Sequence, residues 1–157
     1  MISRRNLLLL SLSPFIQSCR KGRSDPKKIT MRPRVFLEGA APIPILDEYD
    51  FTGVQIGTID NILTDNPDDR SFALWFSLDR RSATTLQRET IRNIGKRLHL
   101  VIAGQTIGVH PIEQSISNGV LPFVLSYVTS EENAMILFQE LNVSLYHIKA
   151  EFAENKG

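Results

Sequence analysis

The stretch of residues 71–78 constrains the fold most, because its apolar side chains alternate strictly. The apolar residues of one face are Phe72, Leu74, Phe76 and Leu78. A period of two residues is typical of a β-strand with one buried face, and Trp75 falls on the opposite face. Asp79 follows directly and predicts the start of a helix, since an N-cap carboxylate accepts a backbone N–H of the first turn. The chain must therefore build a sheet and cover it with a helix.

The rest of the chain extends this strand-and-helix pattern. Further strands are expected at residues 35–38, 51–63, 98–103, 106–110 and 120–128. The first helix is expected to end at Gly95, and a second to begin at Thr129 or Ser130 and run through Leu141. Residues 112–117 extend the sheet or form a loop. These elements predict an α+β fold, with a single mostly antiparallel sheet and two helices packed on one face.

Five motifs in the second half of the chain resemble a known family. They are Phe76-Ser77-Leu78-Asp79, Asn93-Ile94-Gly95-Lys96-Arg97-Leu98, Gly104-Gln105-Thr106-Ile107-Gly108, Ile116-Ser117-Asn118-Gly119 and Thr129-Ser130-Glu131-Glu132-Asn133-Ala134. In this order and spacing, residues 76–145 resemble the head subdomain of the large periplasmic domain of SecD, an accessory subunit of the bacterial protein translocase. The resemblance implies a SecD head-like fold, a periplasm-facing location and contact with polypeptides.

The chain also departs from the SecD pattern. SecD spans the membrane several times and uses charged residues there for proton-coupled work, whereas no long apolar span is visible in this sequence. The family commonly has an aspartate before the hairpin glycine, where this chain has Ala103. Residues 35–70 have no counterpart in the resemblance. Translocase activity is therefore not implied for this chain.

The N-terminus has the parts of an export signal. Arg4 and Arg5 precede an apolar run at residues 7–16, which is too short to cross about 30 Å of hydrocarbon. Ser18 and the single cysteine of the chain, Cys19, follow it. This ending resembles a bacterial lipobox, which implies that Cys19 is acylated and becomes the mature N-terminus; a plain cleaved signal and an uncleaved anchor are the alternatives. The paired arginines also resemble a twin-arginine signal, with the general secretory route as the alternative.

These features divide the chain into a signal peptide (1–18), a lipidated N-terminus with a polar tether (19–34), the SecD head-like domain (35–145) and a C-terminal tail (146–157). Loss of the signal peptide removes two arginines and no acidic residue, which lowers the net charge from +1 to −1. Such a charge lacks the basic footprint of a nucleic-acid-binding domain. The basic tether is either merely solvated or also attracted to anionic lipid headgroups. The expected location is the bacterial cell envelope, facing the periplasm.

The sequence shows no pattern typical of a catalytic or metal site. The histidines His99, His110 and His147 lack the spacing of a helical metal site, and no Gly-x-Ser-x-Gly motif surrounds a serine. The acidic residues at 65–69 surround Pro67 and predict a turn rather than a calcium loop. We therefore expect no catalytic residue, metal or cofactor.

The leading hypothesis is a non-enzymatic, lipid-anchored envelope protein whose domain binds a protein partner or an extended polypeptide. An open sheet edge accepts a peptide strand through backbone hydrogen bonds, and the strand at residues 120–128 is the expected edge. The candidate contact residues are Trp75, Val120, Phe123, Leu125 and Tyr127.

Each part of this hypothesis has an alternative. For Trp75, the alternative to a partner contact is that residues 35–70 cover its side chain. For the function, the alternative is an envelope hydrolase with a site that gathers His99 or His110 beside Glu113. A structural spacer is the third candidate.

Overall fold

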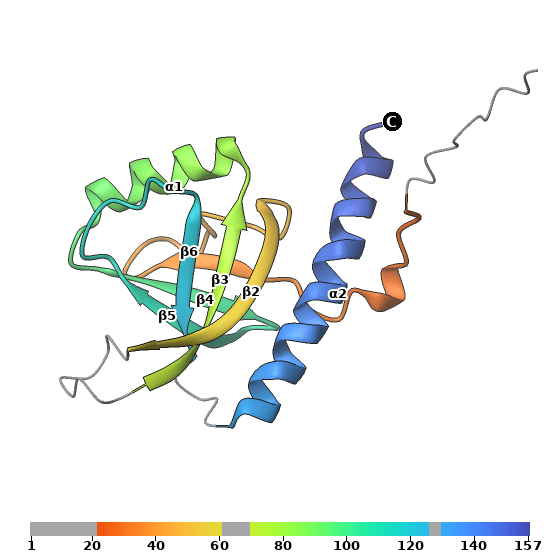
Figure 1. Ribbon diagram of the computed structural model, residues 1–157. Helices are drawn as coiled ribbons and strands as arrows, with labels where there is room; N and C mark the ends of the chain where they lie inside the picture. Colours follow the sequence, from red (N-terminus) through yellow and green to blue (C-terminus); the bar gives the residue numbers. More distant parts are fainter. Residues whose placement is uncertain (1–21, 61–69, 126–129) are drawn as a thin grey trace, which may run out of the picture.

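The computed structural model describes residues 22–60, 70–125 and 130–157, and its centre is one six-stranded antiparallel sheet (Figure 1). The strands are β1 (Arg34–Leu37), β2 (Phe51–Asp60), β3 (Arg70–Leu78), β4 (Arg97–Ile102), β5 (Gln105–Pro111) and β6 (Val120–Val124). Across the sheet their order is β1-β4-β5-β6-β3-β2. The helices are α1 (Arg80–Arg92) and α2 (Glu131–Asn155), and a short 3-10 helix, η1 (Pro26–Lys28), precedes β1. Within the described residues, no helix is long and apolar enough to cross a membrane.

One apolar core joins the sheet to both helices. Leu86 of α1 and Leu141 of α2 are buried in the same cluster as the aromatic side chains of the sheet. The ring centroids of Phe51 and Phe76 lie 4.8 Å apart, and those of Phe76 and Phe123 lie 6.0 Å apart. The predicted α+β fold, with an antiparallel sheet and two helices, is confirmed.

The local signals around β3 explain how the first helix begins. Leu74 and Phe76 are fully buried, as the alternating pattern predicts. Asp79 is the N-cap of α1, and its carboxylate accepts the Ser82 N–H at 2.8 Å. Gly95 has a φ of 89°, but α1 already ends at Arg92, so this glycine turns the chain toward β4 rather than closing the helix.

The second helix is longer than the sequence pattern predicts. We expected it to run only through Leu141 and a tail to begin at residue 146, but α2 continues to Asn155. The turns after Leu141 bury Leu145 and Ile148 in the core. The helical period was obscured there because polar side chains interrupt it, and two of them, Ser144 and His147, are themselves buried.

These buried polar side chains bind the segment expected to be a solvated tether. Ser144 Oγ accepts the backbone N–H groups of Thr30 and Met31 at 3.2 and 3.1 Å. His147 Nδ1 accepts the Asp25 N–H at 3.1 Å. A buried polar group is stable only when it is hydrogen-bonded, so the segment and the helix satisfy each other. Residues 24–34 are therefore part of the domain.

Ion pairs strengthen the same contact. Arg32 reaches Glu48 at 3.2 Å and Glu151 of α2 at 3.0 Å, and Arg34 reaches Glu48 at 3.2 Å. Burial alone would raise the pKa of the Glu48 carboxyl, but hydrogen bonds from its own backbone and from the two arginines lower it below the ordinary 4.5. Arg32, which bridges Glu48 and Glu151, thus ties the start of the domain to the end of α2.

The extension of α2 predicts a stability effect. Ile148 is 1% exposed, so Ile148→Ala should lower the free energy of unfolding by about 2–5 kcal/mol, the usual cost of such a core cavity. Val143 on the same helix is 47% exposed, and Val143→Ala should change stability by no more than about 0.5 kcal/mol. Urea denaturation of both variants measures the difference. Equal stability of the two would show that the end of α2 does not belong to the folded unit.

Candidate functional site

The strand expected at the sheet edge lies inside the sheet. β6 pairs with β3 on one side and touches β5 on the other, while β1 and β2 form the outer edges. The prediction that Phe123 and Leu125 contact a partner is therefore wrong. Phe123 is 0% exposed and Leu125 is 1% exposed, because both side chains point into the core. Val120 is half-buried, and Tyr127 lies outside the described residues.

Trp75 is half-buried because it covers a glycine of the neighbouring strand. A Cβ atom placed on Gly57 of β2 would lie 3.0 Å from the indole ring. An aromatic ring over a strand glycine shields a backbone that has no side chain of its own. This contact agrees with the alternative that residues 35–70 cover Trp75.

The ladder between β5 and β6 contains a single residue pair, Val109 with Val124. In an antiparallel ladder the backbone groups of every second residue meet, so the pair after Val109 and Val124 is Pro111 with Pro122. Proline has no backbone N–H, so neither residue of that pair can donate. The two strands therefore separate at this point, and a cleft opens between them.

The other side of β6 stays fully paired. Leu125 donates its N–H to the Phe72 carbonyl and Leu78 donates to the Gly119 carbonyl, both at 2.9 Å. Backbone groups alternate along a strand, so the odd-numbered residues of β6 face β3 and the even-numbered ones face β5. Pro122 thus has its missing N–H on the side of the cleft, where it removes no bond to β3.

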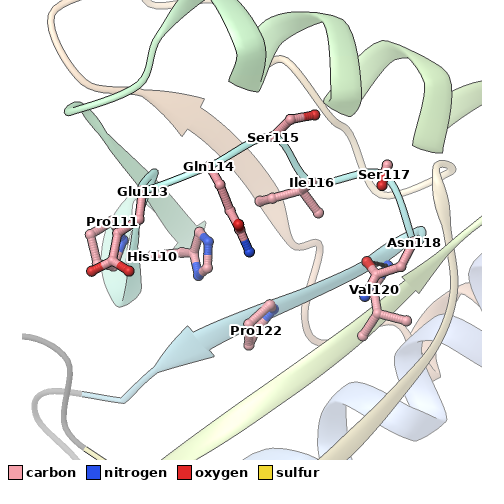
Figure 2. A pocket seen from close by; sticks show the side chains of 10 residues that line it. All are labelled: His110, Pro111, Glu113, Gln114, Ser115, Ile116, Ser117, Asn118, Val120 and Pro122. Atoms are coloured by element: carbon pink, nitrogen blue, oxygen red, sulfur yellow. Dashed lines mark hydrogen bonds between the residues drawn. The ribbon is translucent and has the colours of Figure 1, made fainter.

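The cleft has a volume of about 310 Å³ and a polar lining. His110, Glu113, Gln114, Ser115, Asn118 and Pro122 are among its lining residues. Figure 2 shows the His110 and Gln114 side chains directed toward β6 from β5 and from the loop that follows it. The side chains of two elements therefore meet over the unpaired edge of β6.

The loop at residues 112–119 is fixed from behind by α1. Thr90 Oγ1 accepts the Ile116 N–H at 3.1 Å and donates to the Leu86 carbonyl at 2.9 Å. Ile112 and Ile116 are buried. The loop that forms this wall of the cleft is therefore held by α1, and its position does not depend on a ligand.

His110 is the titratable group of the cleft with a shifted pKa. Burial lowers the pKa of its imidazole below the ordinary 6.5, while a hydrogen bond with the Pro122 backbone and the charge of Glu113 raise it in part. Its Nδ1 atom is buried and has no hydrogen-bond partner in the described part of the chain. The lowered pKa favours the neutral imidazole, and its unpartnered Nδ1 is enclosed by the protein.

The other two histidines lie away from the cleft. His99 of β4 stands beside Phe36 and Val109 in the sheet, and His147 is committed to Asp25. Among the residues that the structure describes, no three His, Cys, Asp or Glu side chains gather closely enough to hold a metal ion. The acidic turn at residues 65–69 lies outside the described residues.

No protein-family model matches the sequence, and no curated protein is similar to it. Solved structures of SecDF share its fold. One, described as a membrane component SecDF that enhances protein export, has a TM-score of 0.52 and 18% identity, over 77% of this chain and 65% of that one. A second, SecDF in a super-membrane-facing form, has a TM-score of 0.52 and 18% identity, over 76% of this chain and 19% of that one.

At this level of identity the similarity shows the fold alone, and the chain spans less than two thirds of either SecDF chain. The predicted resemblance to SecD is confirmed at the level of the fold. The protein therefore contains a domain with a SecD-like fold.

The cleft predicts an acid-sensitive histidine. By NMR, His110 should titrate below 6.5, and Glu113→Gln should lower its pKa further because the raising effect of the Glu113 charge is lost. Since the folded pKa is below the unfolded one, the stability that neutral His110 contributes is lost as the pH falls below 6.5. Glu140→Gln on the exposed side of α2 is the control and should leave the titration unchanged. A His110 pKa at or above 6.5 would contradict the burial of its ring.

Proposed function

We propose that the protein is a non-enzymatic, lipid-anchored protein of the bacterial cell envelope, and that it binds an extended polypeptide in the cleft between β5 and β6. The observation that carries this proposal is the interrupted ladder at Pro111 and Pro122. Neither proline has an N–H to donate, and the register turns the Pro111 carbonyl toward the cleft, while the Pro122 carbonyl accepts from the His110 side chain. An extended polypeptide presents backbone N–H groups at the spacing of a strand and matches such an edge.

The side chains around the cleft favour the same kind of ligand. The Val120 N–H donates to Asn118 Oδ1 at 3.1 Å, so this backbone donor of β6 is not open to a ligand. The Gln114 amide can donate and accept, so it can pair with any peptide group regardless of sequence. The cleft therefore suits recognition of backbone rather than of a particular side chain.

The comparison with SecDF supports a polypeptide ligand. The solved SecDF is described as enhancing protein export, and this chain has a SecD-like fold. A domain of that fold in the same cell envelope is well placed to meet polypeptides outside the cytoplasmic membrane. The anchor at Cys19 would hold it there, facing the periplasm.

Filling the cleft tests polypeptide binding. Gln114 points toward β6, so Gln114→Trp should block the cleft and weaken binding of a reduced, permanently unfolded protein by roughly tenfold, about 1.4 kcal/mol. Thr84→Trp, on the exposed side of α1, is the matched control and should bind like the wild type. Fluorescence anisotropy of the labelled unfolded protein measures both. Equal affinities of the two variants would exclude the cleft as the binding site.

The lipid anchor is tested by Cys19→Ser. Because the substitution exchanges only one sulfur atom for oxygen, this variant should fold normally but leave the membrane fraction, or stay there as an uncleaved precursor. Fractionation combined with mass spectrometry separates these outcomes. A wild-type protein that is soluble, unacylated and cut elsewhere than before Cys19 would contradict the anchor.

A hydrolase of the cell envelope is the second candidate function, and one observation favours it. His110 and Glu113 line the same cleft, and a histidine beside a carboxylate is a pair that general acid–base catalysis uses. In that case His110→Gln would abolish turnover of a cell-wall substrate while leaving polypeptide binding in place. A structural spacer would be indifferent to every substitution in the cleft.

A further inference from the structure

We infer that the face formed by η1 and the C-terminal half of α2 lies on the surface of an anionic lipid bilayer. The inference rests on the proposed lipid anchor and concerns how the anchored domain is oriented. It follows from the short distance along the chain between Cys19 and the first residues that α2 holds.

Ser24 and Asp25 are fixed to the last turns of α2. The Ser24 N–H donates to Glu154 Oε1 at 2.9 Å, and the Ser24 hydroxyl donates to the His147 carbonyl at 3.3 Å. The Asp25 N–H donates to His147 Nδ1. Ser24 is thus attached to α2, and it lies only five residues after Cys19 in the chain.

This spacing sets an upper limit on the height of the domain. Five residues span at most about 17 Å when fully extended. An acylated Cys19 lies at the membrane surface, so Ser24 and the end of α2 must lie within that distance of it. A tether of residues 19–34 would have allowed the domain to stand well clear of the bilayer, and the contacts of residues 24–34 remove most of that length.

The surface around the entry point fits a bilayer chemically. Lys27 and Lys28 of η1 are exposed, and Arg23 precedes them. The nearby acidic groups are Asp25, which accepts the Lys27 N–H, and Glu154, which accepts from Ser24. Basic residues next to a membrane attract anionic headgroups.

An apolar stripe on α2 lies beside these basic residues. Val143 and Tyr146 are 47% and 58% exposed, and the helical period places Ala150 and Ala153 in the same row. The row continues the face that Ser24 reaches and points away from Leu141, Leu145 and Ile148 in the core. A stripe of this kind, with lysines next to it, suits a helix that lies at the level of the headgroups.

This orientation leaves the cleft accessible. In Figure 1, β5 and the loop leading to β6 lie on the far side of the sheet from α2. With α2 at the bilayer, the cleft opens toward the periplasm. The anchored face and the binding site therefore do not compete.

Quenching at a single labelled thiol tests the inference. Acylation occupies the Cys19 sulfur, so Val143→Cys and, as control, Thr84→Cys each provide one free thiol for a fluorophore. The intact acylated protein is reconstituted in vesicles of phosphatidylglycerol and phosphatidylethanolamine. The label at residue 143 should be quenched by iodide at least about threefold less than the label at residue 84, and more by nitroxide lipids.

Two further measurements separate the possible failures. If the wild-type protein does not float with the vesicles, the lipid anchor itself is wrong. If it floats but the two labels are quenched equally, the anchor holds and the orientation is overturned. Lys27→Glu combined with Lys28→Glu should keep flotation and raise iodide quenching at residue 143; unchanged quenching would overturn the role of the lysines.

Discussion

The absence of two backbone donors, at Pro111 and Pro122, decides where the sheet stays closed and where it opens. β6 keeps its ladder to β3 because its missing N–H faces the other way, and the core beneath β3 stays intact. Toward β5 the same absence ends the pairing after Val109 and Val124. Thr90 of α1 then holds the following loop in place, so the opening is a fixed part of the fold.

The domain also depends on polar groups buried between its first residues and its last helix. Ser144 and His147 would each destabilise α2 if they lacked partners, and residues 24–31 would lose hydrogen bonds that order them. Arg32 adds charged contacts to Glu48 and Glu151 at the same place. The first described residues and the last helix therefore pack against each other, away from the cleft between β5 and β6.

The sequence predicted the elements whose signals are local. The alternation in β3, the Asp79 cap and the ordered SecD-like motifs led to the correct fold class, because each depends on residues close together in the chain. The position of β6 inside the sheet depends on which strands pair, and no local pattern encodes that. The meeting of Pro111 and Pro122 likewise depends on the register between β5 and β6. The long α2 was missed because Ser144 and His147 look like surface residues until their partners, more than a hundred residues away, are known.

The attachment of Ser24 and Asp25 to α2 has a mechanical consequence. A pull on an anchor at Cys19 would act on these hydrogen bonds before it reached the sheet, since Ser24 and Asp25 precede β1 in the chain. Val35, tied to Leu46 and to β4, would hold the remainder folded. Release of residues 24–31 would lengthen the linker between Cys19 and the folded domain by roughly 25 Å. If the proposed anchor carried tension, this segment would detach before the sheet, and the domain would move away from the bilayer while still folded.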